Sequence, residues 1–76
     1  MKFEAEATTL SEAMRLTMAI RDKTFRDIAS ELGMTVSTVW RAVRRPGSSQ
    51  ARHLMRVVKW MDIDWNEFAE LWDNEC

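Results

Sequence analysis

The sequence predicts a compact all-α domain of five short helices, and three observations support this class. Residues able to cap a helix recur along the chain, apolar residues follow each of them at helical spacing, and one Pro-Gly pair interrupts the pattern. Seventy-six residues fit a single domain, and a chain of this length buries only roughly 60% of its unfolded surface. We expect one core within a domain at residues 9–76, preceded by an N-terminal tail or short edge strand at residues 1–8.

The first two helices are predicted from their capping signals. Thr9 and Glu12 have capping-box spacing, and apolar residues then recur through residues 10–22. Thr24 can cap a second helix at residues 25–32, where Asp27 can bond back to the cap and meet the positive end of the helix dipole.

Residues 24–44 predict two short helices joined by a three-residue turn at Gly33. Glycine takes positive φ at a helix C-terminus without Cβ strain, and Ala29 is small where the two helices should approach. Thr35 can cap the next helix, which should begin near residue 36 and end by residue 45, before the proline.

A fourth helix is predicted after the Pro-Gly break, with Ser48 or Ser49 as its cap. Its expected inward stripe consists of Ala51, Leu54, Met55, Val58 and Met61.

A fifth helix is predicted from Trp65 to about residue 73, preceded by a capping box of Asp64 and Glu67. Trp65, Phe68, Ala69 and Trp72 lie at helical spacing. Most of the late aromatic side chains should be core; alternatively, one or two tryptophans stay exposed and form a dimer patch.

Charge is unevenly distributed along the chain, although its net value is only −1. Residues 24–59 carry seven basic and two acidic side chains, whereas residues 60–76 carry six acidic and no basic ones. This polarity favours a phosphate-facing side and a separate partner-facing or solvent-facing side. The alternative is that both charge runs are simply solvated faces.

Several classes of function are disfavoured by the sequence. The chain has no apolar run long enough to cross a bilayer, and its start lacks a signal-peptide core, so we expect a cytoplasmic protein without a membrane partner. Cys76 is the single cysteine, which excludes an internal disulfide; it is either incidental or forms an intermolecular bridge. His53 has no cysteine or second histidine at metal spacing, so no metal is assigned. No catalytic constellation or Gly-rich phosphate loop is present, and we expect no enzyme activity, cofactor or small-molecule substrate.

The stretch TFRDIASELGMTVSTVWRAVR resembles the helix-turn-helix of the lambda-repressor-like family, which includes phage Cro proteins, phage immunity repressors and some antitoxins. Ala29, Gly33, Val39 and Val43 stand at the family's small, turn and core positions. The likeness extends over about residues 9–73. It implies a phage repressor, located in the cytoplasm of a bacterial host, that binds double-stranded DNA with its third helix in the major groove.

The resemblance assigns base contacts to Val36, Ser37, Trp40 and Arg41. Arg41 can make the bidentate pair with guanine, or alternatively a nonspecific phosphate contact. Val36 can only make apolar contact, as with a thymine methyl group. Trp40 departs from the family, which usually has a polar side chain here; it either covers thymine methyls or the sugar edge, or folds back over the C-terminus of its helix.

Contacts to the DNA backbone are assigned to residues at the edges of the motif. Arg26 lies near the start of the second helix, whose free amides suit a phosphate, and the amides around Ser48 and Ser49 form a second clamp. The complete set is Arg26, Thr35, Arg44, Arg45, Ser48, Ser49 and Arg52.

These observations predict a Cro-like transcriptional regulator that binds a short operator as a weak or DNA-induced homodimer. The alternative is an interaction protein of the same fold, such as an antitoxin or antirepressor-like factor, whose acidic C-terminal side binds another protein.

Overall fold

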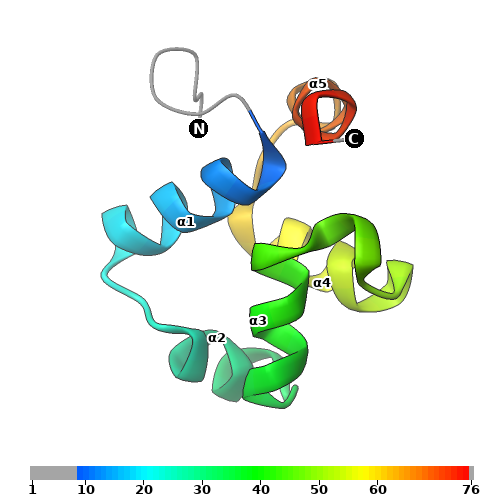
Figure 1. Cartoon of the computed structure of the whole chain (residues 1–76). Coiled ribbons are helices and arrows are strands. Elements are labelled where there is room, and N and C mark those ends of the chain that lie inside the picture. Colours follow the sequence, from blue (N-terminus) through cyan, green and yellow to red (C-terminus); the bar gives the residue numbers. More distant parts are fainter. Residues whose placement is uncertain (1–8, 76) are drawn as a thin grey trace.

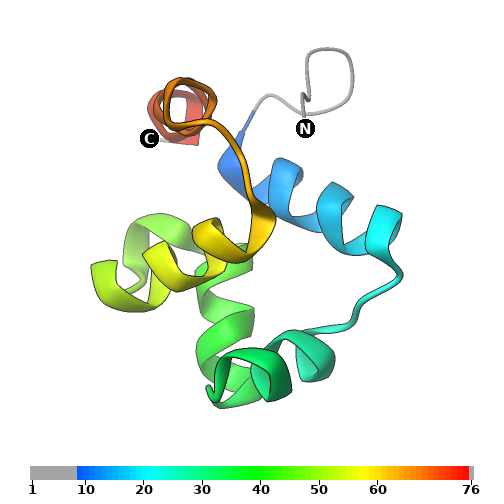
Figure 2. The same cartoon turned by 180° about the vertical axis from the view of Figure 1, so that it is seen from behind.

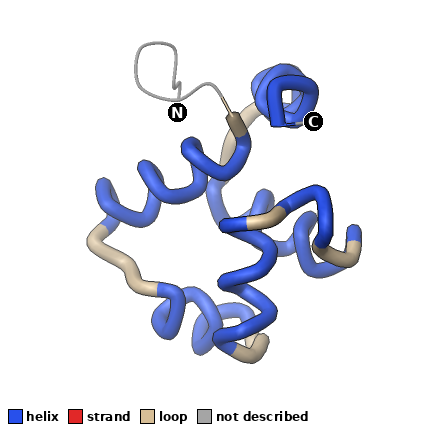
Figure 3. The backbone as a smooth tube through the Cα atoms, viewed as in Figure 1, coloured by secondary structure: helices blue, strands red, loops and turns tan. Residues whose placement is uncertain are grey.

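A computed structural model describes residues 9–75, and every regular element in that range is a helix (Figures 1 and 3). The elements, in order, are α1 (Leu10–Arg21), α2 (Phe25–Leu32), α3 (Val36–Arg44), the short 3₁₀ helix η1 (Pro46–Ser48), α4 (Ala51–Met61) and α5 (Trp65–Glu75). The predicted all-α class with five α-helices is confirmed. The expected tail or edge strand and Cys76 lie outside the described residues.

The core is built around α3, which contacts α1, α2 and α4 (Figures 1 and 2). Val39 and Val43 of α3 are completely buried, as are Ile28 of α2 and Met14 of α1. Because three helices cover the inner face of α3, only its outer face and flanks remain open to solvent. Among residues 9–75, no helix is long and apolar enough to span a bilayer.

The helix ends near the start of the chain form largely as predicted. Thr9 and Thr24 cap α1 and α2, each within a complete capping box. The helix α1 ends one residue earlier than expected, because Asp22 adopts the left-handed conformation with φ of 54°. Gly33 closes α2 at φ of 66°, and its N–H donates to the carbonyl of Ala29.

The predicted start and inner face of α4 are partly wrong. Gln50, not Ser48 or Ser49, is the N-cap residue, and its side chain makes no capping hydrogen bond, because the residues after Arg45 form the 3₁₀ turn first. The face that α4 buries consists of Leu54, Val57, Val58 and Met61. Ala51 and Met55 are exposed, because the helices packed against α4 contact a face that is rotated from the predicted one.

The fifth helix also differs from its prediction. The expected capping box is replaced by a hydrogen bond of 3.3 Å from the N–H of Asn66 to Oδ1 of Asp64. Oε1 of Glu67 is buried and has no hydrogen-bond partner within residues 9–75. The inner face of α5 is formed by Phe68 and Leu71.

The late aromatic side chains are divided between core and surface. Phe68 is buried, Trp60 and Trp72 are half-buried, and Trp65 is 65% exposed. Trp65 therefore does not belong to the core stripe, which agrees with the alternative in which a tryptophan of this region stays exposed.

Candidate nucleic-acid interface

The outer face and one flank of α3 present five of the predicted site residues to solvent. These residues, called here the α3 surface, are Val36, Ser37, Trp40, Arg41 and Arg44. Residues four apart on a helix lie one above the other, so they form two rows: Val36, Trp40 and Arg44 in one, and Ser37 with Arg41 in the other. All four predicted base-contacting residues are thus adjacent and accessible.

Thr35 fixes the start of this surface. Its hydroxyl accepts a hydrogen bond of 3.3 Å from the N–H of Thr38, which confirms it as the cap of α3. The same hydroxyl lies 2.7 Å from Oγ1 of Thr38 and 3.4 Å from Oγ of Ser37. The hydroxyl of Thr35 therefore stabilises the first turn of α3, and the hydroxyl of Ser37 lies within hydrogen-bond distance of it.

Trp40 lies beside the arginines at the end of α3. The guanidinium carbons of Arg44 and Arg45 are 5.9 and 6.0 Å from the centre of its ring, near the outer limit for a cation–π contact. Positive charge therefore borders the indole, and both predicted roles of Trp40 stay predictions. The side chain nevertheless remains 40% exposed, so part of its apolar surface is open to a ligand.

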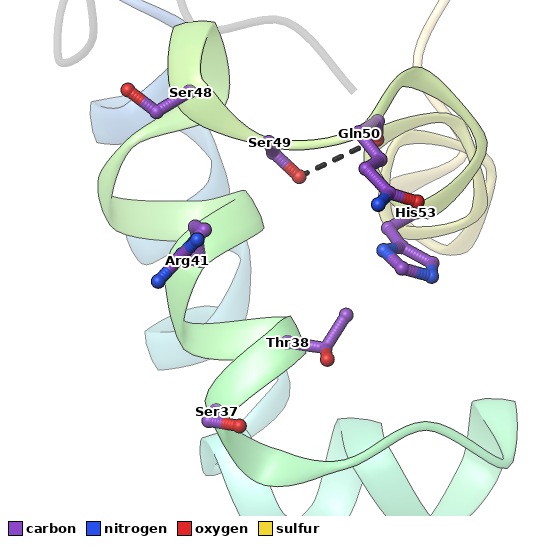
Figure 4. A pocket seen from close by; sticks show the side chains of 7 residues that line it. All are labelled: Ser37, Thr38, Arg41, Ser48, Ser49, Gln50 and His53. Carbon is purple, nitrogen blue, oxygen red and sulfur yellow. Dashed lines mark hydrogen bonds between the residues drawn. The ribbon is translucent and has the colours of Figure 1, made fainter.

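A cleft of about 310 Å³ separates α3 from the start of α4 (Figure 4). Its lining residues are Ser37, Thr38, Arg41, Ser48, Ser49, Gln50 and His53. Hydroxyl, amide, imidazole and guanidinium groups from two helices and their connecting turn are thus brought together. This donor-rich lining suits an anion such as a phosphate group. The sequence indicated Ser37, Arg41 and the two serines, but Thr38, Gln50 and His53 join them only through the crossing of α3 and α4.

The amides of Ser48 and Ser49 themselves are not free for the expected clamp. The N–H of Ser48 donates to the carbonyl of Arg45 at 3.0 Å, and that of Ser49 to the carbonyl of Pro46 at 3.2 Å. Both amides are therefore used by the 3₁₀ turn. Both serines still line the cleft, where the hydroxyl of Ser49 donates to the carbonyl of Gln50 at 3.4 Å, whereas the side chain of Ser48 points away from Gln50 and His53 (Figure 4).

The start of α2 is less open to an anion than expected. Arg26 is exposed there, but the carboxylate of Asp27 accepts a 2.9 Å hydrogen bond from the N–H of Thr24, and the N–H of Asp27 donates to the hydroxyl of Thr24. Hydrogen bonds to this carboxylate from the backbone and then the side chain of Thr24 lower the pKa of Asp27, so its negative charge persists at the helix terminus. A phosphate bound by Arg26 must lie beside that charge.

The remaining backbone candidates are basic and exposed. Arg44 is the last residue of α3 and Arg45 is its C-cap. Arg52 lies in the first turn of α4, where its Nε donates to Oε1 of Gln50 at 3.0 Å. No acidic residue occurs between Glu31 and Asp62. The acidic α5 lies at the other end of the molecule from α2 (Figures 1 and 2). Charge is therefore separated in space as well as along the chain.

Two basic residues have structural partners that sequence reasoning did not identify. Arg56 of α4 donates to the carbonyl of Leu32 at the end of α2. Arg21 donates to the carbonyls of Trp60 and Met61 at 2.6 and 3.0 Å, at the end of α4. Both contacts join residues far apart in sequence, so no local pattern could signal them.

No group of three or more potential metal ligands occurs within residues 9–75. Comparison of the chain with protein-family models, curated proteins and solved structures gives no match.

Proposed function

We propose that this protein is a sequence-specific DNA-binding regulator of the Cro-like repressor kind, active in the cytoplasm of a bacterial host. In this proposal α2 and α3 act as a helix-turn-helix, and α3 enters the major groove of a short operator. The observation that carries the proposal is the α3 surface, where an exposed serine and two exposed arginines lie on a helix without any acidic side chain.

The residues divide by position. Arg41 and Ser37, in one row of the α3 surface, contact base edges, while Val36 and Trp40, in the other row, contribute apolar contacts. The backbone contacts come from the surrounding residues: Arg26, Thr35, Arg44, Arg45, Ser48, Ser49 and Arg52. The cleft beside Arg41 supports this division, because hydroxyl and guanidinium groups together suit a phosphate.

A single domain of this size makes few base contacts, so specific binding requires two copies on half-sites about 34 Å apart. We propose that the copies associate weakly, or only on DNA, through α5. The exposed Trp65, whose ring centre is 5.1 Å from that of Phe68, supplies an apolar contact on this helix.

The same tryptophan supports a second candidate function. Trp65 is 65% exposed on a helix whose charged residues are all acidic. This combination suits contact with a basic protein, as in an antitoxin or antirepressor-like factor. DNA binding is favoured over this alternative because α3 and the residue after it carry three exposed arginines and no acidic side chain.

A gel-shift assay with random duplex DNA at two salt concentrations separates the candidates. If six or more phosphates are contacted, affinity should fall by roughly 10³–10⁵ between about 50 and 200 mM salt. Absence of binding at low salt would reject DNA binding and favour the interaction module.

A further inference from the structure

The helix α3 carries two large apolar side chains that the core does not cover. Val36 is 44% exposed and Trp40 is 40% exposed. They lie four residues apart, hence one above the other on the same side of the helix. We call this pair the apolar strip. The other large apolar side chains that are exposed within residues 9–75, Ile20, Met55 and Trp65, stand singly on α1, α4 and α5.

Positive charge borders the apolar strip. Arg44 continues the same row, and the guanidinium groups of Arg44 and Arg45 lie within about 6 Å of the indole ring. Arg41 is exposed in the neighbouring row. A ligand that covers the strip must therefore offer apolar groups and negative charge close together.

The major groove of DNA offers this combination. Phosphates line its edges, and the C5 methyl group of thymine is the apolar group that its base pairs present within it. We propose that the apolar strip recognises thymine methyl groups and that Trp40 is its main contact. This inference rests on the DNA-binding function proposed above. Selectivity at these base pairs arises from burial of apolar surface, whereas selectivity at Arg41 arises from hydrogen bonds.

The arrangement explains why tryptophan is compatible with this position. An indole covers a large apolar area and has a single donor, so it gains little from hydrogen-bonding base edges but much from covering methyl groups. Arg44 and Arg45 beside the ring can bind phosphates while the free part of the ring faces the groove. Covering one methyl group should raise affinity about fourfold.

Replacement of thymine by deoxyuridine tests the proposal, because it removes the methyl group and keeps the pairing edge. A preferred duplex is first selected from a random pool, and its thymines are then replaced one at a time. The wild-type protein should lose about fourfold in affinity at each contacted thymine. Trp40→Ala should bind the thymine duplex more weakly and no longer distinguish it from the deoxyuridine duplex at the positions that it contacts.

Two further variants complete the test. Val36→Thr keeps the shape of an exposed side chain while replacing a methyl with a hydroxyl group, and should lose discrimination at its own contacted thymine. Ile20→Ala removes an exposed large apolar side chain from α1 and should keep all discrimination. Circular dichroism establishes that each variant is folded.

The failures are distinguishable. If the wild-type protein binds no DNA at low salt, the proposed function itself is rejected. If it binds DNA but treats thymine and deoxyuridine alike, or if folded Trp40→Ala and Val36→Thr keep the wild-type ratios, methyl recognition by the apolar strip is overturned and DNA binding stands.

Discussion

The guanidinium group of Arg56, on α4, donates a hydrogen bond to the main-chain carbonyl of Leu32, the last residue of α2. The final carbonyls of a helix have no partner within the helix, so a cation placed there satisfies an acceptor and opposes the negative end of the dipole. The contact also ties the turn before α3 to α4. The orientation of α3 is therefore fixed by two neighbouring helices.

Arg56→Met should lower the stability of the fold. Methionine keeps an unbranched apolar stem but removes the donor, and the loss should be about 1 kcal/mol, or about 4–8 °C in Tm. Thermal unfolding followed by circular dichroism measures it. Arg15→Met is the control, because it removes an exposed cation from the middle of α1 and should change Tm little. Equal Tm values for the two variants would contradict a capping role for Arg56.

Gly33→Ala should destabilise the protein through its backbone. Gly33 has φ of +66°, and a Cβ atom built there meets nothing within 4 Å, so the cost arises from conformation and not from a clash. We expect a loss of about 1 kcal/mol, visible as a lower Tm. Gly47→Ala is a matched control, since its Cβ would also meet open space and its φ is not positive. A Gly33→Ala protein as stable as Gly47→Ala would disprove the assignment of strain.

The capping and ion-pair carboxylates of α2 should make stability depend on acid pH. Hydrogen bonds from Thr24 lower the pKa of Asp27, and those from Lys23 and then Trp60 lower the pKa of Glu31. A carboxylate whose pKa is lower in the folded state stabilises the fold above its ordinary pKa, and this contribution disappears as pH falls through the folded value. Stability should therefore decline below the ordinary values of 4.5 for Glu and 3.8 for Asp.

Urea unfolding between about pH 6 and pH 2.5 measures this decline. Glu31→Gln should flatten part of it, because glutamine has no charge to lose, whereas Glu70→Gln on α5 should leave the contribution of α2 unchanged. Glu31 also raises the pKa of Lys23. The ion pair therefore stabilises the fold below the ordinary lysine pKa of 10.5, and this stabilisation is lost as pH rises through the pKa of Lys23 in the folded protein. If the decline in stability at acid pH is the same for wild type and Glu31→Gln, the stabilising role of the Glu31 carboxylate is contradicted.

Two arginines of the α3 region should differ in how they affect DNA binding. Arg41→Ala should reduce the preference for a selected operator over random DNA, by roughly 1–3 kcal/mol if the arginine contacts guanine. Arg45→Ala should weaken binding to both DNAs alike, because a phosphate contact carries no sequence information. Fluorescence anisotropy with both duplexes checks this. Similar effects on the preference would count against the division between base and backbone contacts.

Local signals were sufficient to predict much of the fold. The capping boxes at Thr9 and Thr24, the cap at Thr35 and the turn at Gly33 each depend on a few neighbouring residues, and each forms. Side chains of the predicted base-contacting set are exposed because the apolar positions Val39 and Val43 turn the opposite face of α3 inward.

Features that depend on packing between helices were not predictable in the same way. The stripe of α4 shifts to include Val57 and exclude Met55, since the neighbouring helices decide which of several apolar positions faces the core. Ser48 and Ser49 have the chemistry of caps, but the turn imposed by Pro46 uses their amides before α4 begins. The cleft beside Arg41 likewise exists only where α3 crosses the start of α4.

The central claim is that the α3 surface and the adjoining start of α4 bind duplex DNA. Titration of isotope-labelled protein with a duplex, followed by amide chemical shifts in NMR spectra, tests it most directly. We predict that the largest chemical-shift changes occur between residues 35 and 53 and diminish as salt is added. On α5, changes should occur only at residues of the dimer contact. An absence of changes at low salt, or changes centred on Trp65 and α5 with α3 unaffected, would contradict DNA binding by the α3 surface.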